Sequence, residues 1–435
     1  DTETIVRSLL ESKMVYAKPA ALQQMEGLKS TLPFNDDGIQ VGSSFDSATI
    51  ATAFPFVSFD LTSNSGILYG INAHNNSLIL FDRFSLPNGN SVTLGMSGGG
   101  KSYATKLEIL RSLMFGTEVI VLDPENEYER LATAIGGTHY RISLTSEYHI
   151  NPLDLPIPIE GVAPSDQFRS HILEVIGLLK VMLGELSADD EAILDQGVRE
   201  TYASRNITYE SDFMTVTPPL LADLVEVLEN MRGGSELAVR LTKYTKGAFA
   251  GFVNEPTNVD LTSKFVIFNV RDLEEELRPV AMYLVLHYIW NIVRAELKKR
   301  LLIVDEAWWL MQIPSGAAFL RSIVKRARKY YLGVSTITQD VIDFMDSTYG
   351  KEIVANSAMQ FLFKQAPATI DVVQQTFALT DEEKYLLLEA AVGTGLFFAG
   401  QRHVAVHVVA SYTEDELVTT NPAELAGRTR NQTAS

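Results

Sequence analysis

The chain has 435 residues, 46% of them hydrophobic, a formal net charge of −18 and no cysteine. This length and hydrophobic content are typical of a folded protein with a large core, and they exclude an intrinsically disordered chain. The absence of cysteine excludes disulfides, thiolate metal sites and a cysteine nucleophile. The negative net charge excludes a surface that is basic throughout and binds nucleic acid over its whole extent. We therefore expect any nucleic-acid contact to be local.

No segment predicts a membrane span. The strongest candidate, residues 279–293, is about a turn and a half too short and contains His287 and Asn291, so we expect a helix buried in the core. The chain opens with Asp-Thr-Glu-Thr, without a signal sequence or an initial Met. We interpret it as a piece of a longer protein and expect upstream domains outside it.

The amino-acid composition changes within the first ninety residues. Apolar residues recur at helical spacing from Ile5 to Met14, with a break at Pro19, which predicts an N-terminal helical segment over 1–37. Residues 38–90 are rich in Asn, Ser, Gly and Thr and contain short β-prone runs. We expect strands and hairpins at 50–59, 67–71 and 77–81.

Residues 95–102 form a phosphate-binding loop motif. They read Gly-Met-Ser-Gly-Gly-Gly-Lys-Ser and fit G-x-x-x-x-G-K-[ST] at every fixed position, between a β-prone run and an apolar helical stripe. Glycines let backbone N–H groups converge on one anion, and the positive end of the following helix adds attraction. Lys101 is expected to reach the β and γ phosphates, and Ser102 to bind Mg²⁺. The predicted nucleotide-binding residues are Gly95, Met96, Ser97, Gly98, Gly99, Gly100, Lys101, Ser102 and Tyr103.

Apolar strands without polar alternation follow this loop. They lie at 118–123, 265–270, 301–305, 333–338, 359–363 and 396–399. Strands that are apolar on both faces predict an α/β fold with a largely parallel sheet covered by helices.

Residues 163–250 carry three or four amphipathic helices instead, which predicts an all-α insertion. Capping signals place one helix start at Ser187, with Asp190 completing a capping box, and another at Thr217-Pro218. We therefore divide the chain into the helical segment 1–37, a first core part 38–162, the insertion 163–250, a second core part 251–411 and a polar tail 412–435 that we expect to be poorly ordered.

Two further motifs predict hydrolysis in addition to binding. The apolar run 301–304 ends in Asp305 and Glu306, at the strand end where α/β sheets bind ligands. Asp305 is expected to contact Mg²⁺, and Glu306 to polarise the attacking water. The next strand ends at Gln339, whose amide is expected to sense the γ-phosphate or hold that water.

Basic residues supply candidates for an arginine finger. Helix 317–331 carries Arg321, Lys325 and Arg328 as a stripe, and Arg402 follows a predicted strand. For the stripe, three interpretations stay open: a solvated helix face, a finger that reaches a neighbour's nucleotide, or a contact to nucleic-acid phosphate. Within the stripe we favour Arg328 as the finger, Arg402 is a further finger candidate, and Arg271 is a weaker one.

The motifs, taken in order, resemble the VirB/TrbE/TraC-class ATPases of type IV secretion and conjugation systems. They are LGMSGGGKS (94–102), VIVLDPENEY (119–128), INPLD (150–154), LLIVDEAWWLM (301–311) and STITQD (335–340). The resemblance reaches about residue 410 and covers the C-terminal ATPase half of such proteins. It implies a RecA-like P-loop NTPase core that binds ATP and Mg²⁺, with Glu306 as the catalytic carboxylate and Asp123, Glu125 and Glu127 close to the site in roles that the sequence does not assign.

The resemblance also implies a setting for the protein. It implies a homo-oligomer, a hexamer or dimer, at the cytoplasmic face of the cell membrane. Its implied partners are other secretion-machine subunits, including inner-membrane components. Two other functions stay open: a DNA translocase of the HerA/FtsK kind or a conjugative coupling protein, and an assembly scaffold that binds nucleotide with little turnover.

Overall fold

The computed structural model describes residues 2–12, 16–33, 36–40, 42, 44, 46, 47, 60–247 and 249–419. It divides into a unit within residues 1–57 and a larger unit within 58–435. The first unit contains α1 (Thr2–Glu11) and α2 (Gln24–Thr31), neither of which has a buried residue. These helices lie on either side of Pro19, as predicted, and the strand expected at 50–59 lies outside the described residues.

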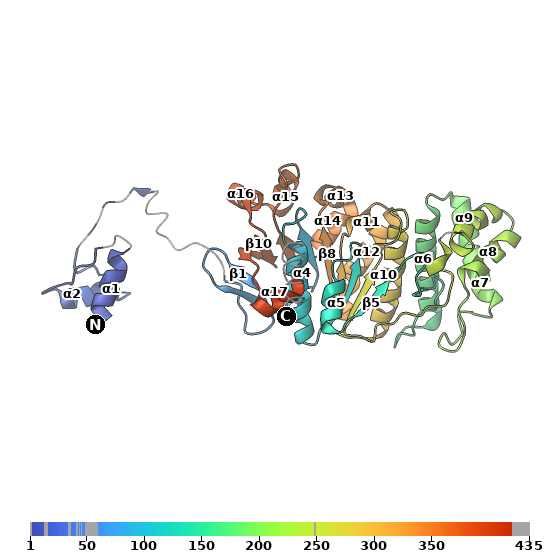
Figure 1. The fold of residues 1–435 in the computed structure, drawn as a ribbon, viewed down its shortest axis with the longest axis horizontal. Coiled ribbons are helices and arrows are strands. Elements are labelled where there is room, and N and C mark those ends of the chain that lie inside the picture. The colour runs from blue at the N-terminus through green and yellow to red at the C-terminus, as the bar shows by residue number, and fades with distance from the viewer. Residues whose placement is uncertain are drawn as a thin grey trace, which may run out of the picture. The chain divides into compact units, whose positions relative to one another are not determined.

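The larger unit is built on one sheet, which has eleven strands in the described part of the chain (Figure 1). Their order across the sheet is β2-β1-β11-β10-β9-β3-β8-β7-β4-β6-β5. Their bounds are β1 (Ile67–Asn72), β2 (Leu78–Phe81), β3 (Ser91–Leu94), β4 (Glu118–Asp123), β5 (Thr138–Arg141), β6 (Phe265–Asn269), β7 (Arg300–Val304), β8 (Leu332–Thr338), β9 (Met359–Leu362), β10 (Thr394–Ala399) and β11 (Arg402–His407).

The sheet is parallel from β9 to β5 and antiparallel from β9 to β2. Every residue of β3, β6, β7 and β8 is buried, because helices cover both faces of the parallel part. The prediction of a largely parallel α/β core is therefore confirmed. Strand β5 was missed, since its four residues alternate weakly and include only one buried side chain.

Two helical layers enclose the parallel strands. On one face, α4 (Lys101–Met114), α5 (Glu129–Ile135) and α17 (Tyr412–Val418) pack together. On the other lie α10 (Arg278–Ala295) and α12 (Pro314–Arg326), with η3 (Ala327–Tyr330) following. Helix α10 is buried along most of its length, as predicted for 279–293. Among the described residues, no helix combines the length and apolarity that crossing a bilayer requires.

The predicted insertion is helical, shown in green in Figure 1, and its first helix packs on α10 and α12. It contains α6 (Pro164–Leu183), α7 (Ala188–Ser204), α8 (Leu221–Asn230) and α9 (Ser235–Thr245). The capping box at Ser187 and Asp190 forms, with backbone-to-side-chain bonds of 3.0 and 3.1 Å. Helix α8 begins at Leu221 and not at Thr217, because each residue before a proline in Thr217-Pro218-Pro219 is disfavoured from the helical region.

The C-terminal part of the core also differs from expectation. Helix α17 forms where a poorly ordered tail was predicted, and residues 420–435 lie outside the described part. A capping box at Ser411 and Glu414 begins this helix. The remaining C-terminal helices are α11 (Trp308–Met311), α13 (Val341–Asp346), α14 (Thr348–Ala355), α15 (Ile370–Phe377) and α16 (Asp381–Glu389).

Candidate functional site

The phosphate-binding loop connects β3 to α4, as the motif predicts. Gly98 and Gly100 have positive φ angles of 74° and 102°. A Cβ on Gly100 would lie 2.6 Å from the backbone N of Gly393, so a side chain has no room there. The loop therefore has the curled backbone that directs N–H groups to an anion.

Two segments far along the chain hold this loop from outside. The Met96 N–H donates to the Lys364 carbonyl at 2.9 Å, just after β9. The Gly393 N–H donates to the Gly99 carbonyl at 3.1 Å, just before β10. Neither Lys364 nor Gly393 lies in a sequence motif, so local spacing does not predict these contacts.

Lys101 is buried inside the loop. Its Nζ donates to the carbonyls of Gly95 at 2.8 Å and Met96 at 3.2 Å. Burial lowers the pKa of Lys101, while the charges of Glu306 and Asp305 act in the opposite direction. The ammonium group and the acidic pair thus share one site.

The acidic pair follows β7, which is separated from β3 by β8 alone. Asp305 accepts from the Tyr128 hydroxyl at 3.0 Å and from the Glu306 N–H at 2.9 Å. Burial, followed by the charge of Glu306, raises the pKa of Asp305 well above its usual range. Among the described residues, no group of three His, Cys, Asp or Glu side chains is placed to hold a metal alone. One carboxylate and the Ser102 hydroxyl match Mg²⁺, which takes its other ligands from water and substrate phosphates.

Glu306 adopts an unusual backbone conformation, with a φ of +44°. A left-handed conformation is costly for a residue with a side chain and is found most often at functional sites. Burial raises the pKa of Glu306, and Lys101, the Gln339 N–H and the Trp308 side chain oppose that rise. The Gln339 N–H lies 3.4 Å from Glu306 Oε2, and the Gln339 side chain is exposed at the same edge of the sheet. The structure thus brings Lys101, Asp305, Glu306 and Gln339 together.

The DPENEY motif supplies three carboxylates with different surroundings. Asp123 accepts from the N–H groups of Glu127 at 3.1 Å and Tyr128 at 3.0 Å, so it holds the turn. Burial raises the pKa of Asp123 to about 6, although both N–H groups oppose this. Glu125 pairs with Arg278 at 3.4 Å. Glu127 acts electrostatically on Lys101 and Asp305, and its buried Oε2 has no hydrogen-bond partner in the described part of the chain.

The INPLD motif, in contrast, supports the insertion. The Asn151 side chain donates to the Pro219 carbonyl at 2.9 Å, and the Asp154 carboxylate accepts from Thr257. These contacts join the segment after β5 to the loop before α8 and to the segment between α9 and β6. This motif therefore identifies the fold and contributes nothing to the phosphate loop directly.

The two arginines favoured as fingers lie at the opposite edge of the sheet. Arg328 precedes β8, whose other end leads to Gln339, and seven residues of strand span roughly 20 Å. Arg402 pairs with Ala399, which pairs with Met359 at the start of β9. Neither is brought to the phosphate loop of its own chain. Arg271 follows β6, at the same end of the strands as the phosphate loop. Four strand spacings, or roughly 19 Å, separate β6 from β3.

The basic stripe is partly neutralised. Arg321 lies 3.2 Å from Glu352 of α14, and Lys325 also pairs with this carboxylate. Arg328 is exposed beyond the end of α12. A contact to nucleic-acid phosphate there would have to compete with Glu352 for two of the cations.

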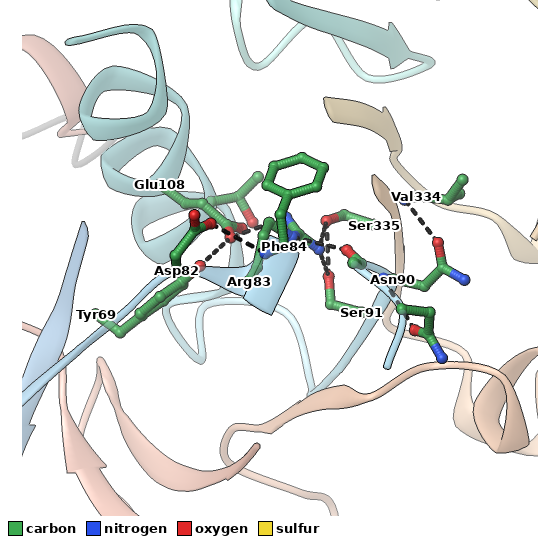
Figure 2. Close-up of polar contacts among 12 residues, drawn as sticks. Tyr69, Asp82, Arg83, Phe84, Asn90, Ser91, Glu108, Val334 and Ser335 are labelled. Carbon is green, nitrogen blue, oxygen red and sulfur yellow. Dashed lines mark hydrogen bonds and ion pairs between the residues drawn. The ribbon is translucent and has the colours of Figure 1, made fainter. Parts of the chain in front are cut away.

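A buried polar network fixes the far ends of the site's strands (Figure 2). Arg83, from the segment after β2, donates to Glu108 of α4 at 2.9 Å, to Ser91 of β3 at 2.8 Å and to Ser335 of β8 at 3.0 Å. Glu108 also accepts from Tyr69 of β1 at 3.0 Å. The β-rich segment thus ties together the two strands and the helix that carry the phosphate loop and Gln339. Arg83 lies in no sequence motif, so local spacing does not predict its role.

Comparisons with known proteins agree with this geometry. The chain matches the model of the central domain of helicase HerA over residues 92–238 and that of the TraG P-loop domain over 226–394. It is 22% identical over 415 residues to the type IV secretion system protein virB4 of Bartonella henselae, and 24% identical over 413 residues to that of Bartonella quintana. These alignments cover 92% of this chain and 50% of each relative, so the chain spans about half their length.

Solved structures give the same result. The bacterial conjugative coupling protein TrwB is 12% identical with a TM-score of 0.57, covering 81% of this chain and 90% of that one, which shows a shared RecA-like P-loop fold. VirB4 of Thermoanaerobacter pseudethanolicus is 30% identical with a TM-score of 0.75, covering 81% of this chain and 99% of that one. The chain therefore belongs to the VirB4 family of type IV secretion system proteins.

Proposed function

We propose that this chain is a Mg²⁺-dependent ATPase that energises the assembly of a type IV secretion or conjugation machine, or substrate transport through it. The observation that carries the proposal is the meeting of Lys101 with the adjacent pair Asp305 and Glu306, from two distant parts of the chain, at one edge of the sheet. Structures of TrwB with ADP and Mg²⁺, and with a non-hydrolysable ATP analogue, support nucleotide and Mg²⁺ in a fold of this kind.

Each of these site residues has a separate role in the proposed reaction, which its surroundings determine. The loop N–H groups and Lys101 hold the phosphates, and Ser102 and Asp305 hold Mg²⁺. Bound Mg²⁺ supplies positive charge that neutralises the phosphate oxygens. Glu306 would orient the attacking water and accept its proton, and Gln339, whose N–H lies 3.4 Å from Glu306 Oε2, would sense the γ-phosphate.

The first test replaces the ammonium group. Lys101→Ala removes the cation that faces the phosphates, so we expect phosphate release to fall at least about 100-fold. Lys325→Ala, at the opposite edge of the sheet, serves as the control and should keep the wild-type rate. Wild-type turnover in Lys101→Ala contradicts the site assignment. Tight ATP binding by the wild type without phosphate release, even with partners added, points to the scaffold function instead.

We also propose that the active form is a homo-oligomer at the cytoplasmic face of the membrane, in contact with other secretion-machine subunits. Both favoured arginines lie away from their own phosphate loop, so a finger at Arg328 or Arg402 has to come from a neighbouring copy. The test is the rate of ATP hydrolysis per subunit against protein concentration. A rate that rises with concentration supports a shared site, and a constant rate contradicts it.

A DNA translocase is the second candidate, favoured by the match to the HerA central domain and the likeness to TrwB. It predicts that duplex DNA stimulates ATP hydrolysis several-fold and that Arg321→Glu with Lys325→Glu abolishes the stimulation. The acidic net charge and the pairing of both cations with Glu352 count against it. A rate of ATP hydrolysis that does not change when DNA is added favours the secretion ATPase.

A further inference from the structure

A hollow lies at the C-terminal end of α4, whose N-terminal end follows the phosphate loop. It is lined by Phe115, which follows α4, and by Lys299, which precedes β7, and its volume is about 460 Å³, within the range of ligand-binding clefts. The length of α4, roughly 21 Å, separates the hollow from the phosphate loop. The apolar side chains of its walls are Ile67, Tyr69, Leu80, Phe81, Phe84 and Phe115.

The walls of the hollow are held in place by the Arg83 network (Figure 2). Arg83 lines the hollow, is 3% exposed, and donates to Glu108 of α4 at 2.9 Å. Tyr69 donates to the same carboxylate at 3.0 Å, and its ring stacks on Phe81 with the centroids 4.8 Å apart. Side chains fixed by such contacts do not move inward to fill the space, so the hollow exists before anything binds in it.

Apolar side chains around the hollow are exposed to solvent. Phe115 is 65% exposed, and Met114 beside it is 76% exposed. The ring of Tyr331, which is 51% exposed, lies 5.4 Å from the ring of Phe84. Tyr331 also has a φ of +56°, an unusual conformation for a bulky residue. Because the apolar surface continues from the hollow onto its surroundings, it is larger than a small molecule needs and is typical of a protein-binding site.

Lysines lie beside this apolar surface, although the chain has a net charge of −18. Lys299 lies 4.6 Å from the Phe84 ring centroid and pairs with Asp82 at 3.1 Å. Both members of this ion pair are about a third exposed, so it contributes little, and Lys299 is free to bind another carboxylate. Lys264 lies next to the start of β4, since its carbonyl accepts from the Val119 N–H at 2.8 Å. Lys264 is exposed and takes part in no ion pair among the residues that the structure describes.

We propose that this hollow docks an acidic amphipathic segment of a partner protein. An aromatic or aliphatic side chain of the segment enters the hollow beside Phe84 and Phe115, and its carboxylates meet Lys299 and Lys264. A hollow that exists before binding accepts this anchor without reorganisation, which lowers the cost of association. An anionic lipid surface fits less well, because its recognition takes clusters of roughly four to eight cations. This function is separate from ATP hydrolysis and does not depend on it.

The first experiment selects short random peptides, displayed on phage, against the immobilised full chain. We expect the selected peptides to carry Asp and Glu around one aromatic or aliphatic residue. Phe115→Ala should bind them at least about 10-fold more weakly than wild type, measured by fluorescence anisotropy of the labelled peptides. Leu173→Ala is the matched control, because it removes a side chain of α6 that is 68% exposed, and it should keep the wild-type affinity. Selected peptides that lack acidic residues, or that bind wild type and Phe115→Ala equally, overturn the proposal.

The second experiment reverses one charge. Lys264→Glu should weaken binding of the selected peptides about fivefold or more at low salt, and less at high salt, because salt screens exposed charges. Lys246→Glu makes the same change in net charge at the end of α9 and should leave the affinity unchanged. Equal losses in the two variants contradict a local role of the charge and overturn the docking of an acidic segment.

The third experiment locates the bound peptide. Because the chain has no cysteine, one introduced cysteine carries a photo-crosslinker to a single chosen position. Ser65→Cys, in the lining of the hollow, should crosslink a selected peptide, whereas Ser235→Cys at the start of α9 should not. Crosslinking at Ser235→Cys alone places the peptide elsewhere and shows that the proposal is wrong.

Two other occupants of the hollow are distinguished by the same variant. Co-sedimentation with phosphatidylglycerol vesicles that is lost in Phe115→Ala identifies a lipid surface. Self-association that is lost in Phe115→Ala, measured by analytical ultracentrifugation, identifies a second copy of the chain. Either result overturns the proposal, and we expect wild type and Phe115→Ala to behave alike in both measurements.

Discussion

Gly100 and Glu306 both adopt left-handed backbone conformations, one in the phosphate loop and one at the end of β7. For Gly100 the reason is close contact, since the Gly393 backbone leaves no space for a Cβ. For Glu306 the turn places a charged side chain beside Lys101 within a buried site. Two unusual backbone conformations, one in the loop and one after β7, thus help to place Lys101 and Glu306 in the same site.

Substitution of Gly100 tests the loop geometry. Gly100→Ala places a Cβ against Gly393, so we expect nucleotide affinity to fall at least about 10-fold, measured by titration with a fluorescent ATP analogue. Gly116→Ala is the matched control, because Gly116 also has a positive φ but has nothing within 4 Å of its added Cβ. It should cost about 1 kcal/mol of stability and leave affinity unchanged. Equal affinities in both variants contradict this account.

Tyr128 tests the support of Asp305. Its hydroxyl donates to Asp305 Oδ2 at 3.0 Å, and residues of this kind orient a metal ligand. Tyr128→Phe is expected to raise the Mg²⁺ concentration for half-maximal hydrolysis about 10-fold, measured by Mg²⁺ titration of phosphate release. Tyr140→Phe, which loses a bond to the Asp260 N–H, is the control. An unchanged Mg²⁺ requirement in Tyr128→Phe excludes this role.

Among the elements, α17 holds the phosphate-loop helix in place. Arg111 of α4 binds Glu414 through two bonds of 2.7 and 2.9 Å and also donates to the Val409 carbonyl at 2.8 Å. Tyr103 of α4 donates to Asp415 at 2.8 Å. Helix α4 therefore receives support from a segment about three hundred residues later, which explains why 412–418 is ordered.

This clamp should depend on pH. The hydrogen bond and charge of Arg111 lower the pKa of Glu414 to about 2, against burial. The folded-state pKa is thus below the ordinary value, so the stabilisation is present above about pH 4.5 and is lost as the pH falls towards 2. Hydrogen exchange in α17 should speed up over that range in the wild type. In Glu414→Gln, α17 should exchange faster already at pH 7. Glu416→Gln should match the wild type, because Glu416 accepts from Arg130 through its backbone carbonyl, which the substitution keeps.

At the scale of the whole larger unit, a buried charged cluster joins the insertion to the core. Glu174 of α6 binds Arg294 of α10 through two bonds of 3.0 Å, with His287 3.5 Å away. Burial alone would raise the pKa of Glu174, but His287 and Arg294 hold it at about 2. The ring of His171 of α6 lies 5.6 Å from the ring of His287, centroid to centroid, and burial lowers the pKa of His171 to about 3. The insertion is therefore attached through specific charges as well as apolar packing.

Breaking this cluster should destabilise the unit. Arg294→Met leaves the Glu174 carboxylate buried without its partner, and we expect a loss of about 3–5 kcal/mol in the free energy of unfolding by urea. Arg199→Met removes an exposed ion pair with Asp195 and should change stability by at most about 0.5 kcal/mol. A loss below about 1 kcal/mol in Arg294→Met would show that the cluster contributes little.

Motifs confined to short stretches were predictable. The phosphate loop, the pair Asp305 and Glu306, and the apolar strands depend on neighbouring residues, so local spacing reveals them. The start of α8 was misplaced because a second proline prevents a helix from starting at Pro218. Strand β5 and α17 were missed because their order depends on partners far along the chain.

The sequence by itself determined the kind of protein, since residues 95–102, the strand ends and the DPENEY and INPLD motifs are contiguous signals of a VirB4-type P-loop fold. The tertiary structure alone decided which groups meet. It set Lys364 and Gly393 against the loop, buried Arg83 between β3 and β8, and placed Arg328 and Arg402 at the far edge. The physical reason is that the contacts of Lys364, of Gly393 and of Arg83 with Ser335 join residues more than two hundred positions apart, whose distance depends on strand order and not on spacing along the chain.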